Sequence, residues 1–308
     1  MAKKFIIGID LGGTNLKIAL LNPKFRIAYK EILSTKNFLS KASLIEAIIK
    51  AVNKVILENN LTRKDILGVG AGLPGPIDAK QGLVHFLPNI AGWKDVKLKQ
   101  ILEKKLRLPV FLDNDANLMC LAEYEMGAAR GAKNAVCITL GTGVGGGIII
   151  DGKLYRGSAF AAGEIGHIPI NENGPKCNCG GVACLEAYIG NNKIIREAAA
   201  SFKKKLTLEE LSRMAHSGNR RARQIWETVA RRLGIALSGV INLINPDCIV
   251  IGGGVANAGR LLFDNVIKTV SERAMTVQSE HVRIFKAKLG DDAGLVGAAI
   301  LAKRGVHG

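Results

Sequence analysis

The segment CNCGGVACLE, residues 177–186, places three of the chain's six cysteines within eight positions, and a glutamate follows two residues after the last one. Clustered thiolates are zinc ligands, and the two glycines between them let a short segment turn around an ion. The same cysteines would form disulfides in an oxidising compartment. The segment therefore predicts a metal site or a disulfide, and the compartment decides between them.

The start of the chain, MAKKFIIGIDLGG, has a basic pair and an apolar run that Asp10 and the glycines interrupt too early for a signal peptide. No apolar run approaches the roughly 18 residues that cross a bilayer. We therefore expect a cytoplasmic protein without membrane contact, in which the cysteine cluster favours a metal. The remaining cysteines, Cys120, Cys137 and Cys248, stand in apolar surroundings and are expected to be buried.

Two glycine turns, DLGGTN at residues 10–15 and LGTG at 140–143, form a second pattern with chemical potential. Residues without a Cβ let backbone N–H groups approach an anion such as phosphate. A plain tight hairpin is the alternative for each turn. The glycines at 141, 143 and 146 lead into a strand rather than a helix, so they do not form a dinucleotide-binding fingerprint, and there is no P-loop.

Acidic residues follow two predicted strands. Asp10 lies beside the first glycine turn and could act as an outer ligand to Mg²⁺. The alternative is that Asp10 only caps the turn. The sequence LDNDAN ends in a polar loop, where Asp115 could accept a proton from a substrate hydroxyl. The alternative is that Asp115 or Asn117 caps the following helix.

The elements that position these residues come in two similar sets. Helical periodicity predicts helices at residues 41–60, 118–129 and 206–244 and at the C-terminus. Short apolar runs predict strands within residues 5–13, 15–23, 26–34, 66–78, 106–117, 135–155, 246–257 and 282–290, with a hairpin at Asp151-Gly152. The order strand, glycine turn, strand occurs in both halves and predicts a duplicated α/β unit, one copy in each of two lobes. At 308 residues the chain is long enough for two lobes.

The net charge of +17 is spread along predicted helices rather than gathered in a tail. A nucleic acid or another polyanion is one partner for such charge. Because no basic run is interleaved with aromatic residues, we favour a solvated basic surface and expect no nucleic-acid partner. An anionic small substrate such as a nucleotide would also benefit from this field.

Taken together, these motifs resemble the ROK family of repressors, open reading frames and sugar kinases, within the hexokinase–actin-like superfamily. The resemblance is carried by DLGGTNLKIAL (10–20), GLPGPID (72–78), LPNIAGW (87–93), LDNDAN (112–117), LGTGVGGGIIIDGKLYRG (140–157), AGEIGH (162–167), CNCGGVACLEAY (177–188), INPDCIVIGGG (244–254) and DDAGLVGAAILA (291–302). It implies an α/β, two-lobed, actin-like ATPase fold with a ribonuclease H-like duplication and a ligand cleft between lobes. The expected small lobe comprises residues 1–117 with about 294–308, and the large lobe 118–293.

The resemblance also assigns roles to residues. It implies one structural Zn²⁺ held by His167, Cys177, Cys179 and Cys184, with Ala183 where the family usually has glycine. It implies Asp115 as the catalytic base and a sugar-binding set of Gly75, Asn89, Asn114, Asp115, Glu164, His167 and Glu186. It implies ATP with Mg²⁺ at Asp10, Gly12, Gly13, Thr14, Lys17, Gly141, Thr142, Gly143, Gly252, Gly253 and Gly254.

The activity that the resemblance implies is transfer of the ATP γ-phosphate to the 6-hydroxyl of glucose. Kinases of N-acetylglucosamine, N-acetylmannosamine, fructose or allose are alternatives within the family, and polyphosphate is an alternative donor. A transcriptional regulator or a non-catalytic sugar sensor is the alternative from another class. Family repressors carry a DNA-binding domain before the first strand, for which we expect no room here. A homodimer built from large-lobe helices, or a tetramer, is the assembly that the family implies.

Overall fold

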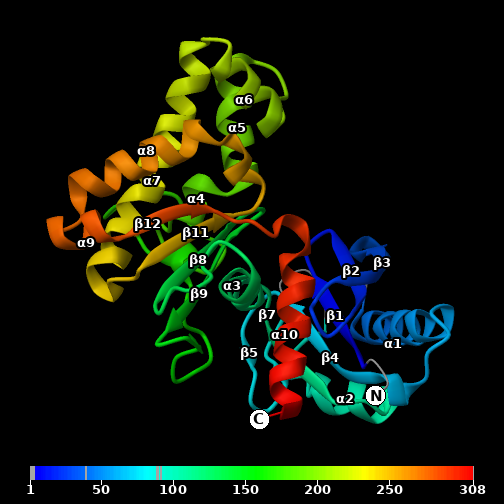
Figure 1. Ribbon diagram of the computed structural model, residues 1–308. Coiled ribbons are helices and arrows are strands. Elements are labelled where there is room, and N and C mark those ends of the chain that lie inside the picture. The colour runs from blue at the N-terminus through cyan, green and yellow to red at the C-terminus, as the bar shows by residue number, and fades with distance from the viewer. Residues whose placement is uncertain (1–3, 39, 88–89, 91, 308) are drawn as a thin grey trace. The chain divides into compact units, whose positions relative to one another are not determined.

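The computed structural model describes residues 4–38, 40–87, 90 and 92–307. The chain divides into two compact units (Figure 1). Unit 1 comprises Met1–Glu125, Leu154–Ala162 and Asp291–Gly308, and unit 2 comprises Met126–Lys153 and Gly163–Gly290. Unit 1 thus extends further along the chain than the small lobe expected from the sequence and includes the separate segment 154–162. The expected lobe boundaries stay a prediction.

Unit 1 is built on a sheet with the strand order β3-β2-β1-β4-β7. The first three strands are antiparallel neighbours, and β4 and β7 run parallel to β1. The strands and the 3-10 helices of unit 1 are β1 (Phe5–Leu11), β2 (Asn15–Leu21), β3 (Ile27–Ser34), η1 (Thr35–Asn37), η2 (Arg63–Asp65), β4 (Ile66–Leu73), β5 (Ile77–Asp78), β6 (Leu83–Val84), β7 (Val110–Asn114) and η5 (Gly290–Asp292). Strand β10 (Lys153–Tyr155) belongs to the sheet of unit 2, and its last two residues fall within the segment 154–162.

Helices cover both faces of this sheet. Along β1, Ile7, Ile9 and Leu11 belong to the core cluster with helices α1 (Lys41–Glu58) and α2 (Leu98–Leu106), as the period of two along a strand requires. The other face receives helix α10 (Ala293–His307), shown in red in Figure 1. Gly70 of β4 permits this contact, because a Cβ there would overlap the backbone of Ala298. Helix α3 (Asp115–Met126) follows β7.

Unit 2 repeats the topology, with a sheet in the order β10-β9-β8-β11-β12. The predicted duplication is therefore confirmed. The hairpin at Asp151-Gly152 is also confirmed, with φ values of 49° and 76°. The strands of this sheet besides β10 are β8 (Ala135–Leu140), β9 (Val144–Ile150), β11 (Cys248–Gly252) and β12 (Arg283–Lys286).

The helices of unit 2 pack on a core that contains Ile225, Val229 and Leu233 of helix α7 (Arg220–Ile244). The helical stretch predicted over residues 206–244 is present as two helices, because Gly218 at φ 91° ends one helix and Asn219 Oδ1 accepts from Ala222 N to begin the next. The helices are η3 (Ile165–His167), α4 (Glu186–Ile189), α5 (Asn191–Phe202), α6 (Leu208–His216), α7 (Arg220–Ile244), η4 (Gly254–Ala258), α8 (Arg260–Arg273) and α9 (Thr276–His281). In the described ranges, no helix combines the length and apolar character needed to cross a membrane.

Candidate active site and metal cluster

The polar loop expected at residues 113–117 is absent, because β7 ends at Asn114 and α3 begins at Asp115. The short segment at this β7–α3 junction is held by a buried carboxylate. Asp113 is 1% exposed. Its Oδ1 accepts from Asn114 N at 2.8 Å and from Asn117 Nδ2 at 2.9 Å. Its Oδ2 accepts from Arg156 Nε at 2.8 Å, and Arg156 Nη2 lies 2.6 Å away. This carboxylate is thus surrounded by donors from the junction itself and from a distant segment.

Asp115 stands at the first position of α3, within the helix. Asn114 caps this helix, since its Oδ1 accepts from Ala116 N at 2.9 Å and from Asn117 N at 3.3 Å. The alternative prediction that Asp115 or Asn117 supplies the cap is wrong, because the helix begins before the residues expected. Asn114 Nδ2 also donates to Gly75 O at 3.1 Å, which ties the junction to the segment after β4.

The first glycine turn joins β1 to β2. Gly12 N donates to Asn15 O at 2.8 Å, so this amide is used within the turn. Thr35 supports the turn from the end of β3, with its Oγ1 donating to Gly13 O at 3.0 Å and its N donating to Thr14 O at 2.9 Å. Sequence reasoning did not single out Thr35, because this contact depends on the pairing of β2 with β3.

Asp10 lies at the end of β1, opposite Lys17 in the register of β1 and β2. The Lys17 Nζ lies 3.6 Å from Asp10 Oδ2 and donates to Asp291 O at 2.8 Å. Burial raises the pKa of Asp10, and the nearby Lys17 opposes this shift. A half-buried carboxylate with a shifted pKa is a candidate functional residue.

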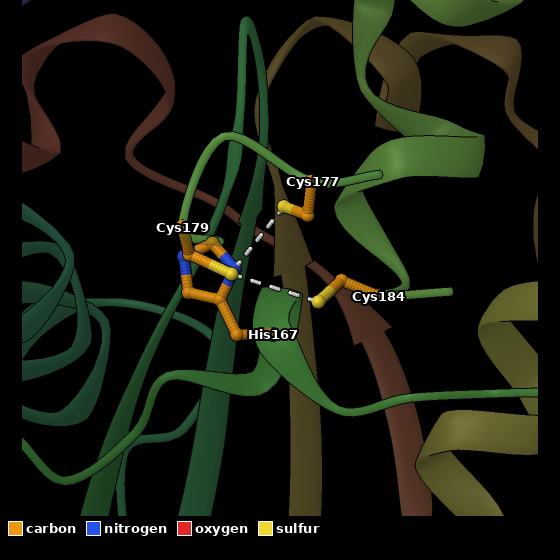
Figure 2. Close-up of side chains that lie close together, drawn as sticks. All are labelled: His167, Cys177, Cys179 and Cys184. Atoms are coloured by element: carbon orange, nitrogen blue, oxygen red, sulfur yellow. Dashed lines mark hydrogen bonds between the residues drawn. The ribbon is translucent and has the colours of Figure 1, made fainter. Parts of the chain in front are cut away.

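Four side chains of unit 2 form the cluster in Figure 2: His167, Cys177, Cys179 and Cys184. Their ligand atoms all lie within 4.8 Å of one another. His167 Nδ1 is 3.6 Å from Cys177 Sγ, and Cys179 Sγ is 3.7 Å from Cys184 Sγ. A tetrahedral Zn²⁺ with bonds of about 2.3 Å to sulfur separates its ligands by about 3.8 Å. The residues therefore fit a closed metal site of one histidine and three cysteines.

Burial raises the pKa of the Cys184 thiol to about 12. The backbone N–H of Gly181, which donates to Cys179 Sγ at 3.4 Å, lowers the pKa of the Cys179 thiol. Ala183 lies between these ligands at φ 59°, a conformation that favours glycine. The left-handed backbone costs about 1–2 kcal/mol, while burial of its methyl group offsets about 0.8 kcal/mol.

Two carboxylates flank the cluster. His167 Nε2, the nitrogen that faces away from Cys177, lies 3.8 Å from Glu164 Oε2. Glu186 Oε1 lies 4.0 Å from Cys177 Sγ. Glu164 is therefore a neighbour of His167, and Glu186 is a neighbour of Cys177.

Glu186 also supports the second glycine turn, which joins β8 to β9. Its Oε2 accepts from Val144 N at 2.8 Å. Gly143 is required beside it, because a Cβ at this position would overlap the same oxygen. Within the turn Gly141 N donates to Gly143 O at 2.9 Å, and Gly141 O accepts from Asn191 N at 2.9 Å. The second glycine turn and the Glu186 carboxylate are therefore in direct contact, and each restricts the position of the other.

The glycines after β11 lie near this turn. Gly253 has φ 86°, and a Cβ there would overlap the backbone of Leu140 at the end of β8. Gly254 faces Asn191, because a Cβ added to Gly254 would lie 3.6 Å from Asn191 Nδ2. A pocket of about 230 Å³ opens beside Thr142 and Glu186 and is lined by the cations Lys176, Lys193 and Arg196. Unit 2 therefore offers a positively charged hollow next to its glycine turn.

Within each unit the structure brings the expected residues together. In unit 1, Asp10, Lys17 and the turn 12–14 lie at one end of the sheet, and Gly75 contacts the β7–α3 junction before Asp115. In unit 2, the cluster, Glu164, Glu186 and the turn 141–143 are neighbours. Asn89 lies outside the described residues. Sequence reasoning gave no role to Arg156, although it belongs to the motif LYRG.

The sequence profile of the ROK family matches residues 6–305. Two glucokinases are similar over nearly the whole chain. One, from Halalkalibacterium halodurans, is 36% identical over 99% of this chain and 96% of its own length. The other, from Thermotoga maritima, is 35% identical over 100% of both chains. A xylose repressor from Caldicellulosiruptor bescii is 31% identical over 95% of this chain and 76% of its own length.

Solved structures have the same fold. A ROK hexokinase from Thermus thermophilus superposes with a TM-score of 0.85 at 32% identity, covering 98% of this chain and 99% of its own. A ROK glucokinase from Streptomyces griseus, in complex with glucose and AMPPNP, has a TM-score of 0.84 at 32% identity and covers 97% of this chain and 99% of its own. The predicted fold class, α/β with two actin-like lobes, is thereby confirmed.

Proposed function

Because the chain belongs to the ROK family, we propose that it is an ATP-dependent hexose kinase that transfers the γ-phosphate of ATP to the 6-hydroxyl of glucose. The observation that carries the proposal is the full-length similarity to glucokinases, at 36% and 35% identity. The described residues support it, since phosphoryl transfer requires a positioned base and amides that stabilise phosphate charge.

Asp115 is the general base that accepts the proton of the attacking hydroxyl. Asn114 holds it in place, because Asn114 both caps α3 and donates to Gly75 O. An unperturbed aspartate has a pKa of about 3.9, far below that of a sugar hydroxyl. The proton therefore moves late, as the new oxygen–phosphorus bond forms. Catalysis then rests chiefly on the position of Asp115 relative to the hydroxyl.

For the sugar, the family resemblance leads us to propose Asn114, Asp115 and the Gly75 segment of unit 1. It also leads us to propose Glu164, His167 and Glu186 of unit 2. A Zn²⁺ ion held by His167 and the three cysteines would fix the segments that carry both glutamates, and the Nε2 of His167 remains directed toward Glu164. Asn89 is proposed for the sugar site from the family resemblance alone.

For the donor, we propose a phosphate-binding role for the glycine turn of each unit. Because Gly12 N and Gly141 N are used within the turns, the amides of Gly13, Thr14, Thr142 and Gly143 take the phosphate role. Mg²⁺, when bound, would neutralise developing charge on the phosphates, and Asp10 is its proposed partner through water. Lys17 lies beside Asp10, and Gly252, Gly253 and Gly254 accept the adenosine. The cationic pocket of unit 2 favours an anionic donor.

The decisive experiment is a coupled ADP-release assay with Mg-ATP and a panel of hexoses and N-acetyl hexosamines. We expect glucose to give the highest kcat/KM and Asp115→Asn to lower kcat by about 10²–10⁴-fold while thermal unfolding is unchanged. Near-normal turnover by Asp115→Asn would refute the assigned base. A higher kcat/KM for an N-acetyl sugar than for glucose would change the proposed substrate but not the proposed reaction class.

A transcriptional regulator is the second candidate, because a xylose repressor is 31% identical to the chain. Sugar binding without ADP release from metal-replete protein would favour it.

We also propose a cytoplasmic protein that forms a homodimer through unit 2. Met275 N donates to Asn242 Oδ1 at 2.9 Å, so the end of α7 lies beside α9. Here Leu243, Met275 and Val277 are 86%, 62% and 74% exposed, and light scattering of Leu243→Lys tests this surface.

A further inference from the structure

The buried carboxylate of Asp113 has a partner that the proposed mechanism does not use. Arg156 places two guanidinium nitrogens on Asp113 Oδ2, at 2.8 Å for Nε and 2.6 Å for Nη2. The side chain of Asp113 is 2% exposed and that of Arg156 is 27% exposed. Charge-assisted bonds of this length in a buried setting are strong and directional. Asp113 lies only two residues before the proposed base, Asp115.

Asp113 itself is not placed to act on a substrate. Both of its oxygens are occupied, Oδ1 by Asn114 N and Asn117 Nδ2 and Oδ2 by Arg156. Its bonds instead define the geometry of the β7–α3 junction, because the residues it holds are the cap of α3 and the third residue of that helix. Asp115 lies between these two held residues. A shift of Asp113 would therefore move the carboxylate of Asp115.

Arg156 belongs to a small closed loop. Arg156 O accepts from Ala162 N at 3.0 Å, and Gly157, at φ 72°, lies against Ala162. This segment, 154–162, belongs to unit 1, although the chain before and after it belongs to unit 2. Glu164, proposed to bind the sugar, follows two residues after the segment ends. The ion pair thus anchors in unit 1 the segment that leads to Glu164.

We infer that Arg156 is a positioning residue for the phosphoryl transfer: it holds Asp113, and through Asp113 the junction that presents Asp115. This inference rests on the proposed kinase function. Misplacement of a catalytic group by about 1 Å can lower the rate about 100-fold. Because Arg156 acts on the base, its loss should lower kcat much more than it raises the KM for glucose.

The test compares Arg156→Lys with a matched control, Arg63→Lys. Lysine keeps the charge beside Asp113 but cannot place two nitrogens on its Oδ2. Arg63 also makes two guanidinium bonds in unit 1, from Nε to Leu106 O at 2.7 Å and from Nη2 to Asn53 Oδ1 at 2.9 Å. We expect Arg156→Lys to lower kcat about 10- to 100-fold with the glucose KM within about threefold. We expect Arg63→Lys to keep both constants.

If Arg156→Lys does not fold, the double variant Arg156→Gln/Asp113→Asn removes the buried charge together with its partner. It is expected to fold and to show the same loss in kcat. Hydrogen exchange over residues 110–120 is measured in each variant, and faster exchange is expected in the Arg156 variants alone. Unchanged exchange, a kcat within twofold of wild type, or an equal loss in Arg63→Lys would overturn the inference. A wild-type chain without hexose turnover would refute the proposed function, and the exchange data would still decide the role of Arg156.

Discussion

Replacement of Gly143 by alanine tests whether the second glycine turn holds the Glu186 carboxylate in position. The added Cβ would overlap Glu186 Oε2 and lie 3.3 Å from Glu186 Cδ. The carboxylate must then leave Val144 N, with which it now makes a 2.8 Å hydrogen bond. A hydrogen bond to a charged group contributes about 1.5–3 kcal/mol. Loss of this bond should lower the free energy of unfolding by about 1.5–3 kcal/mol, and displacement of the Glu186 carboxylate should raise the glucose KM.

The assay is a double-mutant cycle with Glu186→Ala. Unfolding and glucose kinetics are measured for wild type, both single variants and the double variant. In the Glu186→Ala background the alanine at 143 meets no carboxylate, so it should add little further loss. The expected coupling free energy is about 1.5–3 kcal/mol in stability. Additive effects, or a Gly143→Ala protein with wild-type stability and KM, would refute the contact and its role.

Three further predictions concern other parts of the chain. Because burial raises the folded-state pKa of Asp10 above 3.8, its contribution to stability is fully present below pH 3.8 and is lost as pH rises through the folded pKa. At pH 7 and without Mg²⁺, Asp10→Asn should therefore unfold at a higher temperature than wild type, and this difference should vanish near pH 4. The variant should also lose kinase activity. A melting temperature below that of wild type at pH 7 would contradict the prediction. Cys184→Ser should lower the bound zinc, measured by elemental analysis, from about one ion per chain and should raise the glucose KM, whereas full zinc content would contradict the proposed ligand set. In α7, a Cβ added to the exposed Gly239 would have no atom within 4 Å, whereas a Cβ added to Gly234 would lie 2.5 Å from Thr269 Cβ. Gly239→Ala should therefore stabilise unit 2 by about 0.5–1 kcal/mol, and Gly234→Ala should destabilise it by about 1–3 kcal/mol. Thermal unfolding of both variants measures these differences.

Several helices of the structure were not predicted, although a signal was present. In α2, Leu98, Leu102 and Leu106 recur every four residues and are all buried. In α8, Leu262 and Val266 have the same spacing. The strands were easier to predict, because a short apolar run bounded by glycines has the length of a buried strand and is too short for an ordinary helix.

The sequence by itself determined the repeated strand–turn–strand order and the hairpin at Asp151-Gly152, and it predicted a metal site at the cysteine cluster. These properties depend on neighbouring residues, since turn chemistry and hydrophobic period act within a few positions. Only the tertiary structure decided that Asn114 caps α3, that Glu186 supports a turn 42 residues earlier in the chain, and that Arg156 binds Asp113 across 43 residues. Such contacts arise where packing brings distant segments together, and no local pattern specifies which buried carboxylate a given arginine will meet.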